Sequence, residues 1–443
     1  MAELLSVGLD VGTTSSQMVV SKLAVENKAG AFSVPEMEIA EREIVYKSPA
    51  YFTPLMGQDL VNGAALRDIV EQEYEKAGIR RADVDTGAII ITGETSRKEN
   101  AKAVLEALAD LAGDFVVATA GPDLESVLAA KGAGAVDYSA RTGKRVLHFD
   151  IGGGTSNIAL IEDGKITATT CLNVGGRLVK IDRDGKICYV SPVLEGLFDG
   201  RSGDHADQEK LTVLAEKLAS VLEMAAGFRE ADEWLESLET KEIATPVCAL
   251  ARNDNKKVIS FSGGVADCIE TVRNWLEFGD IGPLLGQAIR GSRLCQGDYM
   301  LGAETIRATV IGAGAHSAQL SGSTVFYQNI SFPLKNLAVA EQIGHLSRLD
   351  GPGVLAIKEE GADFAAVRQI ADRIAGAAAG PVYVAAEQDM AKALGVQLAL
   401  RLGPGAQILC IDRVRLQEGD YLDVGAPVGP ALPVVVKTLV MGK

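Results

Sequence analysis

Two short stretches place a carboxylate, glycines and hydroxyl side chains between apolar runs. The first is DVGTTS at residues 10–15, which separates the run "SVGL" from "SQMVV". The second is DIGGGTS at residues 150–156, which separates "VLHF" from "NIALI". Carboxylates can hold a divalent cation, and glycines and hydroxyls can bind phosphate. Such residue types at a strand–turn–strand junction therefore indicate a candidate phosphate and metal site.

The first stretch has the parts that a phosphate site with a metal ion needs. Gly12 allows a tight turn, and successive backbone N–H groups can then form an anion cradle. The hydroxyls of Thr13 and Thr14 can donate to phosphate oxygens. Asp10 repels phosphate but can hold Mg²⁺ or its waters. Ordinary polar hairpin turns use the same residue types, so this stretch alone leaves both interpretations open.

The second stretch indicates a ligand site more strongly than the first, because three glycines follow a buried strand pattern. Gly152, Gly153 and Gly154 cost conformational entropy, and close approach of the backbone to a ligand is one reason for that cost. Asp150 and Thr155 repeat the carboxylate and hydroxyl of the first stretch. A glycine run by itself also occurs without a ligand. Two such hairpins, one in each half of the chain, can face each other and hold one phosphate tail.

Other nucleotide motifs are missing from the sequence. No GxxxxGK[ST] pattern occurs, which excludes a P-loop protein, and no GxGxxG follows the first strand pattern. The glycines at 312 and 314 follow the strand-like run "RATVI", and we expect a structural turn there.

The composition limits the class of protein. The chain has 443 residues, 47% hydrophobic and 23% charged, which is typical of a globular protein of about two to four domains. The net charge of −16 disfavours nucleic acid and anionic membranes as partners. Six cysteines without a CxxC pair indicate reduced thiols and a cytoplasmic location. We find no signal peptide pattern and no membrane-spanning run, and the oligomeric state stays open.

Strand and helix patterns alternate along the chain. The strand patterns include residues 4–11, 16–23, 38–49, 87–95, 114–121, 146–151, 257–261, 353–360, 381–387 and 407–416. The helix patterns cover residues 63–78, 96–113, 123–135, 208–239, 362–379 and 389–398. Because one strand–turn–strand design occurs near residue 10 and again near residue 150, we predict an internal structural duplication. His148 lies inside a strand pattern, where core packing is the expected role.

The two stretches resemble the phosphate motifs of the actin, sugar kinase and heat-shock-70 superfamily. "LDVGTTSSQMVV" resembles the first motif, "FDIGGGTSNIALI" the second, and "ISFSGGVAD", with Gly263 and Gly264, the adenosine motif. The resemblance implies a two-lobed α/β fold of duplicated ribonuclease H-like units, with ATP and Mg²⁺ between the lobes. It implies catalytic and metal-binding roles for Asp10 and Asp150. Glu125 stands at the offset of a glutamate near the attacking water, although an exposed helix start would also explain an acidic residue.

Longer segments resemble the ethanolamine utilization protein A family over nearly the whole chain. They include "ITGETSRKENAKAVLEALA", "ATAGPDLESVLAAKGAGA" and "VIGAGAHSAQLSGSTV". The resemblance implies a chaperone-like, slow ATPase that acts on ethanolamine ammonia-lyase. It would release damaged cobalamin from the inactivated lyase so that intact adenosylcobalamin can bind. It also implies cobalamin contact only through that client, and association with the ethanolamine utilization microcompartment.

We expect a first lobe at residues 1–145, a second lobe at 146–330 and a further α/β region at 331–443. Three other functions stay open at this point: a small-molecule kinase of the same superfamily, an actin-like structural ATPase, and an ATP-dependent amidohydrolase subunit. The kinase would need a catalytic base, for which the sequence shows no convincing motif.

Overall fold

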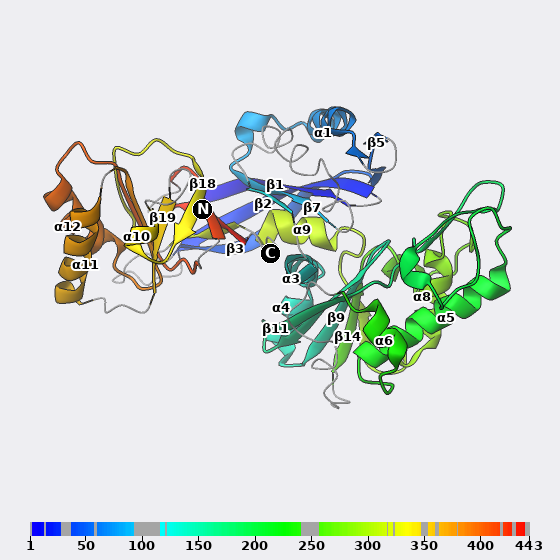
Figure 1. Cartoon of the computed structure of the whole chain (residues 1–443). Helices are drawn as coiled ribbons and strands as arrows, with labels where there is room; N and C mark the ends of the chain where they lie inside the picture. Colours follow the sequence, from blue (N-terminus) through cyan, green and yellow to red (C-terminus); the bar gives the residue numbers. More distant parts are fainter. Residues whose placement is uncertain are drawn as a thin grey trace.

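The computed structural model describes residues 2–12, 15–27, 37–56, 60–92, 116–119, 122–240, 257–316, 318–321, 324–346, 353–358, 363–378, 380–416, 420–427 and 431–438. Within these ranges the chain forms two sheets of matching strand order and a third sheet built from the C-terminal part (Figure 1). The helix predicted at residues 96–113 lies outside the described residues.

The first sheet has the order β3-β2-β1-β7-β8, and β4 pairs with β2. Its strands are β1 (Ala2–Val11), β2 (Ser15–Asn27), β3 (Met37–Lys47), β4 (Tyr51–Phe52), β7 (Thr86–Ile91) and β8 (Val116–Thr119). β1 runs antiparallel to β2 and parallel to β7. This register brings the ends of β1 and β7 to the same edge of the sheet.

Helix α1 (Gly63–Ala77) covers one face of the first sheet, after the small hairpin of β5 (Leu55–Met56) and β6 (Leu60–Val61). Its buried residues Leu66, Val70 and Tyr74 recur every four positions and pack against alternate residues of β1. The helix ends at Gly78, whose φ of 67° is the left-handed C-cap that glycine favours. The helix predicted at residues 63–78 is therefore confirmed. A 3₁₀ turn, η1 (Arg81–Asp83), leads on to β7.

The second sheet repeats the order of the first, as β11-β10-β9-β14-β15. Its strands are β9 (Val146–Ile151), β10 (Ser156–Glu162), β11 (Lys165–Leu172), β14 (Val258–Ser262) and β15 (Tyr299–Leu301). In both sheets the central strand, β1 or β9, is antiparallel to the next strand along the chain, β2 or β10. It is parallel to its other neighbour, β7 or β14. The predicted duplication is therefore present in the strand order.

The remaining elements of the second half surround this sheet. They are α4 (Ala135–Thr142), β12 (Val179–Ile181), β13 (Ile187–Val190), η3 (Pro192–Leu194), α5 (Gln208–Ala225), α6 (Glu233–Leu238), η4 (Ala266–Cys268), α8 (Gly282–Gly291) and η5 (Arg293–Cys295). The single helix predicted at residues 208–239 was wrong. α5 ends before Gly227, which has a φ of 72°, and Asp232 caps a new helix by accepting from the N–H of Trp234.

Two helices lie between the sheets, and each contacts the sheet of the other half of the chain. α3 (Pro122–Gly132) contacts β9, β10 and β11, whereas α9 (Ala308–His316) contacts β1, β2 and β7. Figure 1 shows the two helices stacked where the sheets approach each other. The lobe boundaries predicted at residues 145 and 330 stay a prediction.

The turn predicted at residues 312–314 was wrong, because these residues belong to α9. The glycines serve close helix packing instead. A Cβ on Gly132 of α3 would overlap the carbonyl oxygen of Ala308, and one on Gly312 would overlap that of Leu128. With hydrogen in place of a side chain at both positions, the two backbones come into direct contact.

The third sheet has the order β16-β23-β22-β18-β19-β20-β21-β17. Its strands are β16 (Ala318–Leu320), β17 (Phe326–Gln328), β18 (Leu334–Ala340), β19 (Gly353–Ile357), β20 (Val382–Ala386), β21 (Ile408–Asp412), β22 (Asp420–Val424) and β23 (Pro433–Thr438). The associated helices are α10 (Ile343–Leu346), α11 (Phe364–Ala377) and α12 (Ala391–Leu402). The further α/β character predicted for the C-terminal part is thus observed.

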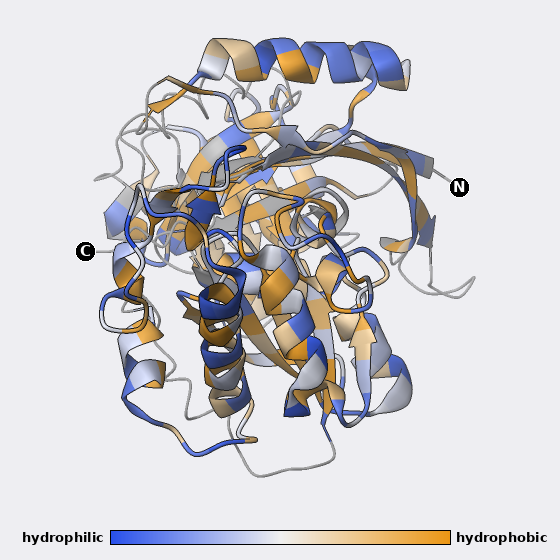
Figure 2. Cartoon of the chain, turned by 90° about the vertical axis from the view of Figure 1, so that its right-hand side faces the viewer, coloured by the Kyte–Doolittle hydropathy of each residue, from blue (hydrophilic) through white to orange (hydrophobic). Residues whose placement is uncertain are grey.

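Hydrophobic residues gather on the central strands, and hydrophilic residues lie mainly on the outer helices and loops (Figure 2). None of the helices in the described ranges has the length and apolarity that crossing a bilayer requires.

Asp412, at the end of β21, competes with Asp389 for one hydroxyl proton. Thr324 Oγ1 can donate one hydrogen bond, yet it contacts Asp412 Oδ2 and lies 2.8 Å from Asp389 Oδ1. Burial, and then the charge of Asp389, raises the pKa of Asp412 to about 7. Folding therefore favours the protonated form, and this group's stabilising contribution is lost as the pH rises from about 4 to about 7.

We expect Asp412→Asn to raise the free energy of unfolding at pH 8 by roughly 1 kcal/mol and to flatten the pH dependence of that free energy between pH 5 and pH 8. Thermal unfolding across this range measures the effect. A variant whose pH profile matches that of the natural chain would contradict the assignment.

Candidate functional site

The first turn joins β1 to β2 and ends β1 in a carboxylate. The N–H of Gly12 donates to the carbonyl oxygen of Ser15 at 3.0 Å, which closes the turn. Thr53, next to β4, donates its hydroxyl to the carbonyl oxygen of Gly12 at 2.7 Å. Thr92, which follows β7, donates to Asp10 Oδ1 at 2.8 Å. Thr13 and Thr14 lie outside the described residues.

The second turn joins β9 to β10 and has the same closure. The N–H of Gly152 donates to the carbonyl oxygen of Thr155 at 2.9 Å. A second glycine pair lies against this turn: Gly176 donates to the carbonyl oxygen of Gly152 at 3.0 Å, and the N–H of Arg177 donates to that of Gly153 at 2.6 Å. These two hydrogen bonds therefore hold the loop after β11 against the backbone of the glycine turn.

Both turns open onto one cavity of about 410 Å³. Many of the site residues predicted from the sequence line this cavity. They are Asp10, Gly12, Glu125, Asp150, Gly152, Gly153, Gly154, Thr155, Gly263 and Gly264. They come from four separate parts of the chain and from both sheets. Their chemical roles stay a prediction, but their meeting at one cavity is a property of the structure.

Asp10 and Asp150 share an electrostatic environment that favours a cation. Burial raises the pKa of Asp10 to about 7, the hydrogen bond from Thr92 opposes this, and the charge of Asp150 adds to it. Burial also raises the pKa of Asp150 to about 6, against hydrogen bonds from Ser262 and Thr309. Because a divalent cation would offset the cost of both charges, the pair fits Mg²⁺, which is held by one or two carboxylates together with waters and phosphates.

A buried chain of hydrogen bonds leads from Asp150 into the second sheet. Ser262 Oγ donates to Asp150 Oδ1 at 2.5 Å, and His148 Nε2 and Nδ1 lie 3.0 Å from the hydroxyls of Ser262 and Ser260. Because Ser262 donates its one proton to Asp150, His148 Nε2 must carry the proton that it shares with Ser262. Burial lowers the pKa of His148 to about 3, so its ring is neutral. The sequence analysis correctly predicted that His148 is buried, but it did not predict the hydrogen bonds that connect His148 through Ser262 to Asp150.

Several cavity residues escaped the sequence analysis. Those that line the cavity are Thr92, Gly176, Arg177, Asp267, Arg273, Asp280 and Thr309. Ser262 does not line the cavity but donates to Asp150, which does. The glycine pair in "NVGGRLV" was a readable signal for Gly176 and Arg177. Ser262 could not be assigned from spacing, because only the parallel register of β9 and β14 pairs it with Asp150.

Two sheets of one strand order, each with an Asp-x-Gly hairpin at a shared cavity, define an actin-like α/β protein. The sequence pattern of the family described as ethanolamine utilisation protein EutA matches residues 2–358 and 348–442. This chain belongs to that family, which confirms the resemblance seen in the sequence.

Two curated relatives are similar over nearly their whole length. The ethanolamine ammonia-lyase reactivase EutA of Salmonella typhimurium is 37% identical over 99% of this chain and 98% of that protein. The protein of the same name from Escherichia coli is 39% identical with the same coverage. Among solved structures, the Aquifex aeolicus PPX-GPPA enzyme has a TM-score of 0.41 at 12% identity, covering 70% of this chain and 99% of that chain.

Proposed function

We propose that this chain is an ATP-dependent reactivating factor for ethanolamine ammonia-lyase. Membership of the EutA family and the names of its curated relatives support this role. The observation that carries the ATP-dependent part is the shared cavity, where two Asp-x-Gly turns from matching sheets meet.

The residues of the cavity suit Mg·ATP. Backbone N–H groups and hydroxyls of the two turns would bind the phosphates, and Asp10 and Asp150 would hold Mg²⁺ or its waters. The bound ion would supply charge neutralisation to the phosphates. Glu125 lines the same cavity and would orient the attacking water, while Gly263 and Gly264 would let the nucleoside pack on backbone.

An ATP-dependent reactivating factor must bind the lyase with a different affinity in its ATP-bound and ADP-bound states. A ligand shifts a conformational equilibrium only through its differential affinity for the two conformations. We propose that the lobes close on ATP and open on ADP, with slow hydrolysis as the switch. The cycle would release damaged cobalamin from the lyase, and cobalamin would meet this chain only through that client. It would act in the cytoplasm, in association with the ethanolamine utilization microcompartment.

A recovery assay tests the proposal. Ethanolamine ammonia-lyase is inactivated with cyanocobalamin and then incubated with this protein, Mg·ATP and adenosylcobalamin. We expect lyase activity to return with ATP, and not with ADP or when nucleotide is omitted. If activity returns equally without nucleotide, or does not return at all, the ATP-dependent reactivase assignment is wrong. In the latter case phosphate transfer to sugars and polyols would test the kinase alternative.

The hydrogen-bond chain behind Asp150 gives a prediction for a positioning residue. Ser262→Ala removes the donor to Asp150 Oδ1, so the carboxylate loses its fixed orientation. We expect ATP turnover to fall about tenfold, the effect of a lost hydrogen bond to a charged group. Steady-state assays at varied Mg²⁺ measure this.

Ser260→Ala is the matched control, because Ser260 contacts His148 on the ring nitrogen that faces away from Ser262. The ATP turnover of Ser260→Ala should stay within about twofold of that of the natural chain. This change is much smaller than the roughly tenfold loss expected for Ser262→Ala. Equal losses in the two variants would mean that the sheet was disturbed generally.

A further inference from the structure

An exposed aromatic side chain stands beside the first turn. Phe52 is 77% exposed and lies on β4, which pairs with β2 at Ser15 and Ser16, directly after the turn. An exposed aromatic residue is unremarkable in isolation. Here, however, its ring lies 5.6 Å from the guanidinium carbon of Arg177, which belongs to the second turn's surroundings. The pair therefore joins the strand beside the first turn to the loop beside the second turn.

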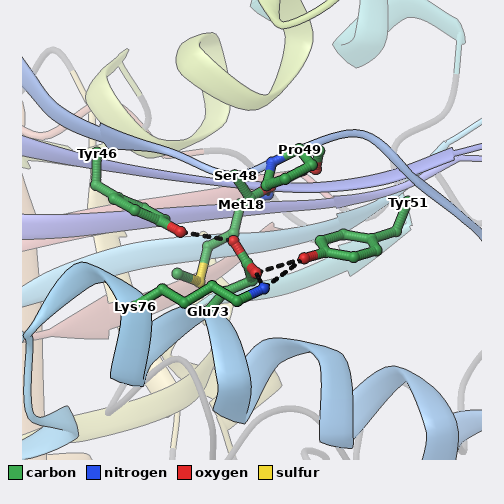
Figure 3. A network of polar contacts seen from close by, with 7 residues as sticks. All are labelled: Met18, Tyr46, Ser48, Pro49, Tyr51, Glu73 and Lys76. Carbon is green, nitrogen blue, oxygen red and sulfur yellow. Dashed lines mark hydrogen bonds and ion pairs between the residues drawn. The ribbon is translucent and has the colours of Figure 1, made fainter.

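The segment that carries Phe52 is held firmly on both sides. Tyr51 donates to Glu73 Oε1 at 2.5 Å, Tyr46 donates to Glu73 Oε2 at 2.7 Å, and Lys76 pairs with the same carboxylate at 2.6 Å. Figure 3 shows this network, with Glu73 of α1 between the two tyrosines. On the other side, Thr53 donates to the first turn. The exposure of Phe52 is thus imposed by its neighbours.

Arg177 is positioned by its backbone and by one atom of its side chain. Its N–H donates to the carbonyl oxygen of Gly153, in the middle of the glycine turn. Its Nε pairs with Asp280 Oδ2 at 3.1 Å, and Asp280 is fixed through the N–H of Gly282. Within the described residues, no hydrogen bond from the two terminal amino groups is found. These two groups form the fork that binds phosphate oxygens.

Acidic side chains in the cavity lining would repel a phosphate group, which favours a cation beside it. The cavity lining includes the carboxylates of Asp10, Glu125, Asp150, Asp267 and Asp280. The arginines that line it in the described ranges are Arg177 and Arg273. Arg273 pairs with Glu277 and stacks on Phe278, in the segment after the Gly263–Gly264 pair. Arg177, in contrast, is attached to the glycine turn itself, where a polyphosphate would lie.

We propose that Arg177 binds the polyphosphate of the nucleotide and that its contact with Phe52 closes the mouth of the cavity over it. This inference rests on the proposed nucleotide site and adds a specificity-determining residue to it. The Nε–Asp280 pair holds the guanidinium plane, and the terminal amino groups face the phosphates. Because Phe52 belongs to the first sheet, phosphate binding to Arg177 favours closure of the two lobes.

Equilibrium titration of ATP, ADP and AMP with Mg²⁺ tests the arginine. Arg177→Gln keeps a donor for Asp280 but removes the charge and the fork. We expect ATP and ADP to bind about tenfold to a hundredfold more weakly and AMP to change by less than about threefold. Arg401→Gln is the control, because Arg401 pairs with Asp372 in the C-terminal part, outside the cavity lining. Thermal unfolding of each variant checks that it is folded.

Stopped-flow dissociation of a fluorescent ATP analogue tests the contact across the mouth. Phe52→Ala should release the analogue several-fold faster, whereas Phe364→Ala, at a residue 65% exposed on α11, should not. If Arg177→Gln binds ATP like the natural chain, or weakens ATP and AMP equally, the inference is wrong while the nucleotide site stands. If the natural chain binds no nucleotide, the proposed site and this inference both fail.

Discussion

Replacing Asp150 by asparagine is expected to remove most Mg²⁺-dependent ATP turnover and, at the same time, to stabilise the nucleotide-free protein. Turnover should fall by about two to three orders of magnitude, the typical loss when a preorganised charged or polar group is removed from an active site. Stability should rise because the carboxylate is 5% exposed and its pKa is raised to about 6 by burial. The amide has the same shape without the charge.

The sign of the stability effect follows from the direction of the pKa shift. The pKa of Asp150 is higher in the folded chain than its usual value of 3.8, so its stabilising contribution is present at low pH and is lost as the pH rises to about 6. At pH 8 the folded chain therefore carries an unfavourable buried charge. We expect Asp150→Asn to gain about 1–2 kcal/mol there, measured by denaturant unfolding in the presence of a chelator.

Asp10→Asn should lose turnover in the same way, because Asp10 lines the same cavity. Asp163→Asn is the matched control: Asp163 has a φ of 49° in the turn after β10, a conformation that asparagine also adopts readily. Turnover in either cavity variant that equals that of the control would refute the Mg·ATP assignment. Lost turnover together with lost stability would instead indicate a structural role.

Gly132→Ala is expected to cost about 3 kcal/mol or more of the free energy of unfolding. The added methyl group would overlap the carbonyl oxygen of Ala308 and crowd the N–H of Gly312. Both are backbone atoms of α9, so no side-chain rotation can relieve the overlap. The helix must shift as a unit, and α9 also packs on β1 and β7. Denaturant unfolding followed by circular dichroism measures the loss.

Gly376→Ala isolates the effect of the close contact from that of the residue type. Gly376 also lies in a helix, α11, but a Cβ there would meet no atom within 4 Å. This change should stabilise the protein by about 0.5–1 kcal/mol, since alanine has the higher helix propensity. A Gly132→Ala variant that loses less than about 1 kcal/mol would show that the two helices can separate at little cost.

The local pattern of the sequence predicted the strands on either side of the two turns and the helices α1, α11 and α12, but it missed α4, α8 and α9. The Asp-x-Gly turns were readable because a strand pattern, a carboxylate and glycines follow one another within a few residues. The split between α5 and α6 was also readable, since Gly227 and Asp232 are a helix stop and a helix start. The family was determined by long segments that run through nearly the whole chain.

Only the tertiary structure decided what the remaining polar and glycine residues do. Gly312 looked like a turn residue because its apolar, glycine-rich surroundings have no distinct period, and its contact with Leu128 joins residues far apart in sequence. Ser262 and Thr92 reach the two aspartates through parallel strand pairing, and Arg177 contacts Phe52 of the first sheet. Local preferences depend on neighbours along the chain, whereas these contacts depend on how two sheets are placed, which no short stretch of sequence encodes.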